Sequence, residues 1–372
     1  MAKSVDLVYY NAGGGHHAAA LALQEVIRLQ GRRWRVRLID LMEVLDPKGR
    51  LHKLTGLAHE PRLLQGMVRL GHAWMLRTLQ QHWLGTEPDL VVSLVPHFNR
   101  VLCESLGSTL PGVPFATVLT DMADPPPHCW IEPGLRQHLV CGTPHAVAQA
   151  RGAGCPDHRV WPTSGMVLRP SFYRTAEVDR TAALKALGLN PARPTALVMF
   201  GGRGSTQMLA IAKALPDVQL ILLCGHNDAL ADRLRVLPTQ ARHAVVAFTP
   251  DVCRCMDLAD FFIGKAGPGC LSEAVQMGLP ILTFENSRAL AHERYNVDWV
   301  REHRIGLVLK SVRSIRPGTL EMIGHLPEFQ ARMRLIDNRA VFEVADILAS
   351  LMRSACDPAP HRFIPTTALA AA

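Results

Sequence analysis

The chain has 372 residues, 48% of them hydrophobic and 19% charged, which is typical of a folded globular protein large enough for two domains. Forty Lys and Arg against 32 Asp and Glu give a formal net charge of +8, which suits an anionic membrane, a phosphorylated substrate or nucleic acid. Nucleic acid is the weakest of the three, because the sequence has no zinc finger, RNP-like strand or basic tail. Nine scattered cysteines and an N-terminus that begins as a strand, without a signal peptide, predict a cytoplasmic protein.

Short apolar runs alternate with helical patterns along the chain, which predicts βαβ units and parallel sheets. Six strands are expected in the first half, at residues 6–10, 36–40, 89–95, 114–120, 138–141 and 159–163. Six more are expected in the second half, at residues 196–200, 219–224, 244–248, 261–263, 281–284 and 307–309. The predicted fold class is therefore α/β, with two doubly wound Rossmann-like domains that face each other across a cleft. Ligands of such sheets bind at the carboxyl ends of the strands.

The boundary between the two predicted domains falls where the chain crosses over, between residues 165 and 194. We assign residues 1–168 to the first domain, residues 169–354 to the second and residues 355–372 to a loosely ordered tail rich in Pro and Ala. The long helical stretch at 328–352 is expected to pack across the domain junction.

A glycine-rich loop, Asn11–His17, follows the first predicted strand and opens a helix. Its glycines allow the backbone to approach a ligand closely, and a helix N-terminus favours negative charge. Gly13, Gly15 and Ala18, with Asp40 at the end of the second strand, also fit a dinucleotide fingerprint. An NAD-dependent enzyme is therefore one interpretation of this loop.

A second strand–turn–helix segment lies in the later half of the chain. The turn Gly267–Gly269 follows the strand at 261–263, and the next helix opens near Pro268. Proline suits the first helical turn, whose exposed N–H groups form an anion site. Glu273 lies one turn further, where a carboxylate can accept hydrogen bonds from a sugar diol, and a later loop carries His292 and Glu293. These parts together predict a pocket for a sugar nucleotide.

This segment resembles the donor-binding motif of GT-B glycosyltransferases. It is most similar to the group that contains monogalactosyldiacylglycerol synthase, the processive diacylglycerol glucosyltransferases and the bacterial peptidoglycan N-acetylglucosaminyltransferase. The group's pattern reads roughly K-x-G-P-G-T-x-x-E-A-x-x-x-G-x-P, then Q-E-x-x-N. The matched positions are Lys265, Gly267, Pro268, Gly269, Glu273, Ala274, Gly278, Pro280, Glu293 and Asn296. Cys270 stands in place of the usual Thr, and His292 in place of the usual Gln beside the donor sugar.

The resemblance covers about residues 5–350 and implies the GT-B fold. It also implies inverting transfer of a hexosyl group from a UDP-sugar to a hydroxyl of a lipid-like, diacylglycerol-type acceptor at the inner face of the cell membrane. Glu273 would hold the ribose, and His292 and Glu293 the sugar hydroxyls. His16 would be the general base, because a near-neutral imidazole can take a proton from a hydroxyl, although a structural role in the turn is the alternative. No metal or other cofactor is expected, since helix dipoles and basic side chains would stabilise the departing UDP.

Other segments are similar to the remaining loops of this family. Phe248 and Thr249 match the segment that meets the uracil edge. Asp121, at the end of a predicted strand, would orient His16 or hold an acceptor hydroxyl. A second glycine loop resembles the one that faces the diphosphate, and its residues are Gly201, Gly202, Arg203, Gly204 and Ser205. The acceptor side would be lined by Gly14, Gly15 and His97.

The region between residues 50 and 85 is the expected acceptor-side insertion. Apolar and basic side chains alternate in it with helical spacing, and they are Leu63, Leu64, Met67, Leu70, Trp74 and Leu76 with Arg62, Arg69, His72 and Arg77. Such a helix can lie on an anionic membrane, and packing on its own sheet is the alternative.

Three other functions remain open. An NAD-dependent enzyme would explain the first glycine loop but would leave the segment from Gly267 to Glu273 unused. A UDP-sugar epimerase or hydrolase of the same fold would keep the donor site without the acceptor helix. A non-catalytic nucleotide-sugar-binding protein would accommodate the unusual Cys270 and His292.

Overall fold

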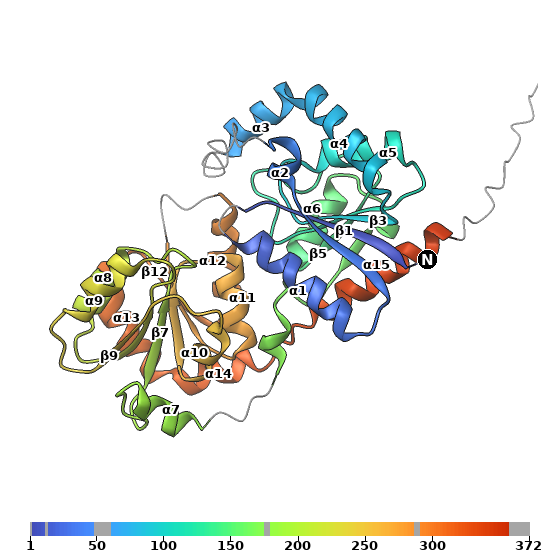
Figure 1. The fold of residues 1–372 in the computed structure, drawn as a ribbon. Coiled ribbons are helices and arrows are strands. Elements are labelled where there is room, and N and C mark those ends of the chain that lie inside the picture. The colour runs from blue at the N-terminus through green and yellow to red at the C-terminus, as the bar shows by residue number, and fades with distance from the viewer. Residues whose placement is uncertain (1, 12–13, 48–60, 175–178, 286–290, 357–372) are drawn as a thin grey trace, which may run out of the picture.

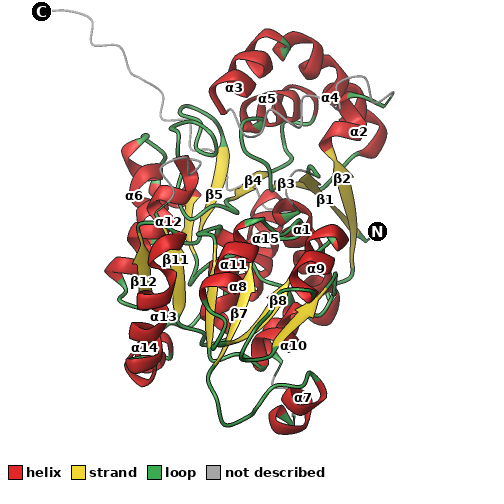
Figure 2. Ribbon diagram, turned by 90° about the vertical axis from the view of Figure 1, so that its left-hand side faces the viewer, coloured by secondary structure: helices red, strands yellow, loops and turns green. Residues whose placement is uncertain are grey.

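The computed structural model describes residues 2–11, 14–47, 61–174, 179–285 and 291–356, which form two lobes (Figure 1). Each lobe is built on one parallel six-stranded sheet with helices packed against it (Figure 2). Every strand predicted from the sequence is present, although several ends are shifted by a few residues. The predicted α/β fold class, with two doubly wound sheets, is therefore confirmed.

The first sheet has the strand order β2-β1-β3-β4-β5-β6. Its strands are β1 Lys3–Tyr9, β2 Trp34–Asp40, β3 Leu90–Ser93, β4 Phe115–Val118, β5 Gln137–Cys141 and β6 Val160–Pro162. Its helices are α1 Gly15–Leu29, α2 Leu41–Leu45, α3 Pro61–Leu70, α4 His72–Thr86, α5 Asn99–Thr109, α6 Pro144–Gly152 and the short turn η2 Asp157–Arg159. The inner strands β3 and β4 are buried at every residue, as expected for strands covered on both faces.

The second sheet has the strand order β12-β11-β10-β7-β8-β9. Its strands are β7 Thr195–Met199, β8 Gln219–Leu223, β9 His243–Val246, β10 Phe261–Gly264, β11 Ile281–Phe284 and β12 Gly306–Leu309. Its helices are α7 Arg180–Ala186, α8 Gln207–Ala214, α9 Asp228–Arg235, α10 Val252–Asp257, α11 Pro268–Gln276, α12 Ala291–Glu302, η4 Val312–Ser314, α13 Ile315–Gly324 and α14 Leu326–Met333. Apolar clusters on both faces of this sheet form the core of the second lobe.

The strand order reverses at one point in each sheet, and ligands of doubly wound sheets bind beside such points. In the first sheet the reversal lies between β1 and β3, and in the second it lies between β7 and β10. The loop after β1 and the first turn of α1 carry the candidates Gly14, Gly15 and His16, and the loop after β3 carries His97. The loops after β7 and β10 carry the second glycine loop and the segment from Lys265 to Gly267. The topology thus places the candidates of each lobe around its own reversal point.

The chain crosses between the lobes twice. The outward crossing contains η3 (Pro170–Tyr173), which contacts both α1 and α11. The stretch expected as one helical run at 328–352 is two helices, because the chain leaves the second lobe after α14 and returns as α15 (Ala340–Cys356). Helix α15 joins the core of the first lobe beside α1 (Figure 1). The two crossings touch, since Asn338 Nδ2 donates to the Met166 carbonyl at 2.9 Å.

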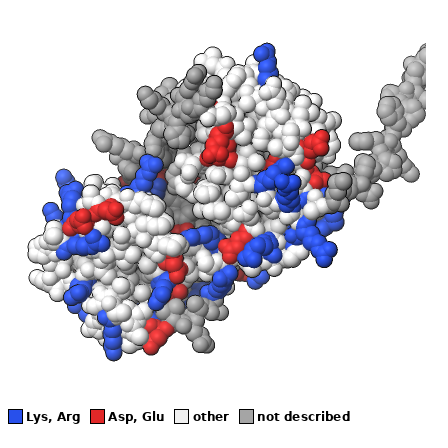
Figure 3. All heavy atoms as spheres, viewed as in Figure 1, with Lys and Arg blue, Asp and Glu red and all other residues white. Residues whose placement is uncertain are grey.

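Helices α3 and α4 stand at the end of the first lobe that is remote from the second (Figures 1 and 2). Gly71 separates them, so the expected amphipathic helix is a helix pair. Leu64, Val68 and Met75 face the core, while Met67, Leu70 and Trp74 are exposed. No helix among the described residues is long and apolar enough to cross a membrane. On the face seen in Figure 3, Lys and Arg are spread over both lobes and intermixed with Asp and Glu.

Candidate active site

The glycine loop after β7 needs residues without side chains at two places. Gly201 and Gly204 have φ angles of 83° and 58°, in the left-handed region that favours glycine. A Cβ atom on Gly204 would lie 2.7 Å from the Cys224 carbonyl oxygen, and one on Gly201 would lie 3.8 Å from Lys265 Cε. The loop is therefore packed against the end of β8 on one side and close to Lys265 on the other.

A third glycine, which the sequence interpretation missed, supports this loop from behind. Gly225 follows β8 with a φ of 62°, and a Cβ atom there would lie only 2.2 Å from the Gly202 carbonyl oxygen. The next residue, His226, donates its backbone N–H to that same oxygen at 2.9 Å. The signal in the sequence was the glycine directly after the buried strand β8.

The segment after β10 is held by side chains from α12. Asn296 is fully buried and donates through Nδ2 to the Ala266 carbonyl at 2.8 Å. Glu293, only 8% exposed, pairs with Lys265 through an Oε1–Nζ distance of 3.4 Å. Helix α11 begins at Pro268, as the sequence predicted. Two matched motif residues on α12 thus position the loop that leads into α11.

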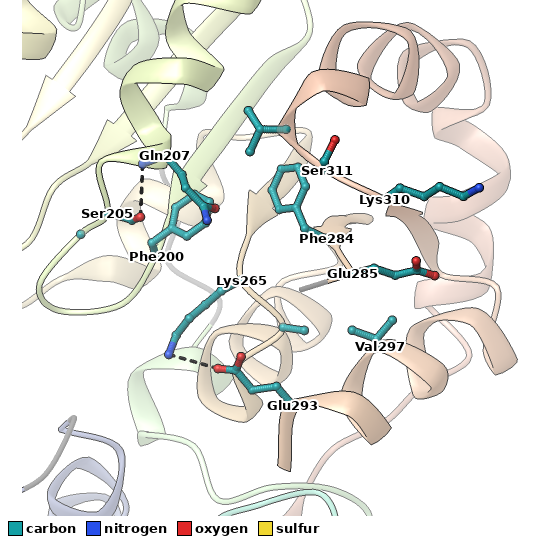
Figure 4. A pocket seen from close by; sticks show the side chains of 13 residues that line it. Phe200, Ser205, Gln207, Lys265, Phe284, Glu285, Glu293, Val297, Lys310 and Ser311 are labelled. Atoms are coloured by element: carbon teal, nitrogen blue, oxygen red, sulfur yellow. Dashed lines mark hydrogen bonds and ion pairs between the residues drawn. The ribbon is translucent and has the colours of Figure 1, made fainter. Parts of the chain in front are cut away.

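These loops enclose a pocket of about 520 Å³ at the carboxyl edge of the second sheet (Figure 4). Lys265 and Glu293 point toward each other at one end of it, and Phe200, Gln207 and Phe284 stand further in (Figure 4). Its lining residues are Phe200, Gly204, Ser205, Gln207, Lys265, Ala266, Phe284, Glu285, Glu293, Val297, Lys310, Ser311 and Val312. Four predicted donor residues therefore meet in one pocket, namely Gly204, Ser205, Lys265 and Glu293.

Glu273 lies in α11 and does not line this pocket. Burial raises the pKa of Glu273 to about 7, and the nearby positive charge of Arg169 opposes this rise. Burial also raises the pKa of the Cys270 thiol to about 12, with the charge of Glu273 acting in the same direction and that of Lys265 against it. Glu273 is thus a partly buried carboxyl group just past the middle of α11.

Arg169 connects Glu273 to the segment after β9, and the sequence interpretation also missed this residue. Its Nη1 donates to the Pro250 carbonyl at 3.0 Å. The adjacent Phe248 is 54% exposed and stacks on His226 with ring centroids 3.8 Å apart. Thr249 accepts the Asp251 N–H through its hydroxyl. Phe248 and Thr249 therefore lie next to the Arg169–Pro250 contact and outside the lining of the 520 Å³ pocket.

The remaining donor candidates have more ordinary positions. Arg203 is exposed and outside the pocket lining, and its carbonyl accepts from Asn227. Ser205 precedes the cap position of α8, which is Thr206, although the Ser205 hydroxyl accepts the Gln207 N–H at 3.2 Å. Gly269 is exposed with open space around it. His292 belongs to the first turn of α12, and its side chain lies outside the described part of the structure.

In the first lobe, His16 lies in the first turn of α1 beside the end of β4. Its Nδ1 is 2.9 Å from the Thr120 hydroxyl oxygen, and its ring packs against Tyr10 and Trp130 at centroid distances of 4.8 and 5.9 Å. Gly14, at the N-cap of α1, has a φ of 81°, and Gly15 begins the helix. The imidazole is thus oriented by a hydroxyl and two aromatic rings.

Asp121 contacts Trp130 in this structure, since its Oδ2 accepts from Trp130 Nε1 at 2.9 Å. The hydroxyl beside His16 belongs instead to Thr120, the residue before it in the sequence. Asp124, which is 5% exposed, accepts the backbone N–H groups of His128, Cys129 and Trp130. Asp121 and Asp124 together fix the loop that carries Trp130 against His16.

His97 contacts the same loop through Cys129. Its backbone has a φ of 70°, and its N–H donates to the Cys129 carbonyl at 2.5 Å. Its ring Nε2 is 3.8 Å from Cys129 Sγ. His97 therefore lies on the predicted acceptor side, in contact with the loop that also touches His16.

Comparison with known proteins agrees with this arrangement. Residues 196–321 match the family model described as the glycosyltransferase family 28 C-terminal domain. The chain is 27% identical over 94% of its length to monogalactosyldiacylglycerol synthase 1 of Arabidopsis thaliana, of which it covers 71%. MurG of Acinetobacter baumannii superposes with a TM-score of 0.63 at 14% identity, covering 94% of this chain and 99% of that one. The glycosyltransferase SnogD of Streptomyces nogalater gives a TM-score of 0.59 at 16% identity, covering 95% and 100%.

The two doubly wound lobes and their structural neighbours define the GT-B glycosyltransferase fold. The second lobe matches the model of the glycosyltransferase family 28 C-terminal domain, and the chain is similar over most of its length to the monogalactosyldiacylglycerol synthases. The resemblance recognised in the donor motif is thereby confirmed.

Proposed function

We propose that the protein transfers a hexosyl group from a UDP-sugar to a hydroxyl of a lipid-like acceptor, with inversion at the anomeric carbon. The observation that carries this proposal is the convergence of the glycine loop, Lys265 and Glu293 on one 520 Å³ pocket. Polar side chains at a topological switch point suit a phosphorylated, hydroxylated ligand. The relationship to the galactolipid synthases supports the same class of reaction.

In this proposal the donor occupies the 520 Å³ pocket and extends beyond it to Glu273 of α11. The hexose occupies the pocket beside Glu293, and the diphosphate lies between the glycine loop and the N-terminus of α11, where backbone N–H groups and the helix dipole favour negative charge. Lys265, whose side chain lies beside Gly201, adds a positive charge there. The ribose reaches Glu273, and the uracil meets the segment of Phe248 and Thr249.

The transfer needs one base and one stabilised leaving group. His16 takes the proton from the acceptor hydroxyl, whose oxygen attacks the anomeric carbon as the bond from that carbon to the UDP oxygen breaks. The electron pair leaves with UDP, whose negative charge Lys265 and the α11 dipole stabilise. Because Thr120 engages Nδ1 of His16, we assign the proton transfer to Nε2.

The acceptor would approach through the first lobe from an anionic membrane surface. Met67, Leu70 and Trp74 on α3 and α4 are 37%, 91% and 46% exposed. Arg69 and Arg77 are exposed on the same two helices. Exposed apolar and basic side chains on neighbouring helices are typical of a protein that lies on a membrane. We propose that the protein is cytoplasmic and binds reversibly to the inner face of the cell membrane.

A ligand screen and one variant test the reaction. Thermal unfolding should shift upward with UDP and one UDP-hexose but not with NAD, because a ligand at 100 times its Kd adds about 2.7 kcal/mol of apparent stability. His16→Ala should lose roughly 10²- to 10⁴-fold in kcat while UDP affinity stays the same. Near-normal turnover in this variant would leave His16 with a structural role. Consumption of the UDP-sugar without any glycosylated lipid would instead indicate an epimerase or hydrolase.

Vesicle sedimentation tests the membrane claim. The protein should bind anionic but not neutral liposomes, with binding that weakens as salt rises, since each basic residue at such a surface contributes about 1 kcal/mol. Replacing Arg69 and Arg77 with Gln should weaken binding, whereas the same change at Arg235 on α9 of the second lobe should not. Equal recovery from both kinds of vesicle at low salt would favour a soluble acceptor.

A further inference from the structure

The segment after the edge strand β9 carries an exposed aromatic ring with a ring partner on one face. Phe248 is 54% exposed, and its ring stacks on the imidazole of His226 with ring centroids 3.8 Å apart and ring planes 18° apart. Among the residues that the structure describes, no second ring stacks on Phe248. Nucleobases bind proteins by stacking on aromatic rings of this kind. Phe248 is therefore a platform for a planar base, with His226 behind it.

The segment that carries His226 connects the ends of three strands. Cys224, the first residue after β8, donates its N–H to the Val246 carbonyl at the end of β9, at 2.8 Å. Two residues later His226 donates its N–H to the carbonyl of Gly202, in the glycine loop after β7, at 2.9 Å. The ring behind Phe248 thus belongs to a backbone that is bonded to the glycine loop on one side and to β9 on the other.

The two neighbours of His226 leave this backbone little freedom. Gly225 has a φ of 62°, and a Cβ atom on it would lie 2.2 Å from the Gly202 carbonyl oxygen, so the two segments are in close contact. Asn227 is the N-cap of α9, and its Nδ2 donates to the Arg203 carbonyl at 3.2 Å. Both ends of the segment are therefore fastened to the glycine loop, and the position of the His226 side chain follows from that of the loop.

From these contacts we infer that His226 is a positioning residue for the nucleotide, because it holds the Phe248 ring as a platform for the base at a fixed place relative to the glycine loop. This inference rests on the proposed function, in which the base meets Phe248 and the diphosphate lies at that loop. An unsupported Phe side chain on the surface can occupy several rotamers, and a ligand that selects one of them binds more weakly. The stack on His226 orders the ring before the ligand arrives.

Ligands that carry the base, the phosphates or both separate this role from a structural one. UMP, UDP and inorganic pyrophosphate are titrated into the full chain by calorimetry. His226→Ala removes the ring and keeps the backbone N–H that bonds Gly202. It should weaken UMP and UDP by about twofold to tenfold, as expected for one lost aromatic contact, and should leave pyrophosphate unchanged. His226→Phe restores a ring behind Phe248 and should return UDP binding to the affinity of the wild type.

His303→Ala is the matched control. His303 also lies in the second lobe and its ring contacts Trp299 with centroids 4.3 Å apart, but neither residue lines the 520 Å³ pocket or touches Phe248. This variant should bind all three ligands as the wild type does. Equal UDP affinity in the wild type and in His226→Ala would overturn the inference. An equal loss of UDP and pyrophosphate would also overturn it, because His226 would then act through the glycine loop alone.

A failure of the proposed donor has a different result. GDP and TDP are titrated alongside UDP for this purpose. If the wild type binds one of them and not UDP, the proposed donor is wrong, whereas the base platform is supported when His226→Ala weakens that nucleotide by the same factor and overturned when it does not.

Discussion

Glu273 is predicted to lower the free energy of unfolding of the unliganded protein at neutral pH. The same side chain is proposed to bind the donor. Burial raises its pKa from an ordinary value of 4.5 to about 7, so the folded protein binds this proton more tightly than the unfolded chain does. Between these two pH values, stability is therefore lost as pH rises, and above about pH 7 the loss is complete. Glu273→Gln keeps the shape of the side chain and removes the charge, so it should remove this loss.

The expected size follows from the two pKa values. A change from 4.5 to about 7 corresponds to at most about 3 kcal/mol of unfolding free energy. The variant should thus match the wild type near pH 4.5 and exceed it by up to that amount at pH 8. For a lobe of this size, each kcal/mol raises the midpoint of thermal unfolding by about 2–4 °C. The same change should weaken UDP by roughly 1–3 kcal/mol, because the ribose loses a charged hydrogen-bond acceptor.

Thermal unfolding at pH 5, 6.5 and 8 measures the first effect, and titration calorimetry with UDP at pH 8 measures the second. Glu321→Gln, on the exposed face of α13, is the control for a change of net charge. If the difference in stability between Glu273→Gln and the wild type does not depend on pH, the burial of the charged Glu273 carboxylate does not lower the stability of the protein. Unchanged UDP affinity would separately refute its role in the donor site.

Three further predictions concern residues that support the site. Thr120→Val should lower kcat by about tenfold without changing UDP affinity, because it removes the hydroxyl 2.9 Å from Nδ1 of His16, and Thr120→Ser should restore the rate. Gly225→Ala should destabilise the second lobe by more than about 2 kcal/mol in thermal unfolding and weaken UDP, since its Cβ would lie 2.2 Å from the Gly202 carbonyl oxygen. Tyr295→Ala should raise the hydrolysed share of consumed donor, because Tyr295 of α12 stacks on His145 of the first lobe with ring centroids 4.2 Å apart. Tyr295→Phe, which keeps the ring but loses the hydroxyl that bonds Thr143, should raise it less, and product analysis by chromatography distinguishes the two.

The sequence was sufficient for the fold class because most of the inner strands are short, nearly continuous apolar runs. In a parallel sheet covered on both faces, every residue of a strand such as β11 is buried, so the run stands out from the helices around it. The turn before Pro268 was equally readable, since Pro at the first helical position and glycine before it mark a helix start. Local rules therefore located α11 and its loop.

Contacts between segments far apart in the sequence were not readable in this way. Thr120 touches His16 only because β4 and the start of α1 meet at one edge of the sheet, and Arg169 reaches Pro250 only because the crossing segment lies along the second lobe. The break between α14 and α15, inside the helical stretch predicted at 328–352, was missed for a related reason. Its apolar pattern continues into α15, but the partner changes from the second core to the first.

Helix α12 shows how the two lobes can act on one site. On one side its Asn296 and Glu293 hold Ala266 and Lys265 of the donor loop. On the other side its Tyr295 stacks on His145 of α6 in the first lobe, with ring centroids 4.2 Å apart and ring planes 17° apart. Because these contacts come from neighbouring residues of one helix, we expect a shift of the first lobe against the second to move the donor loop as well. Closure of the lobes would then bring His16 toward the donor and exclude water in the same movement.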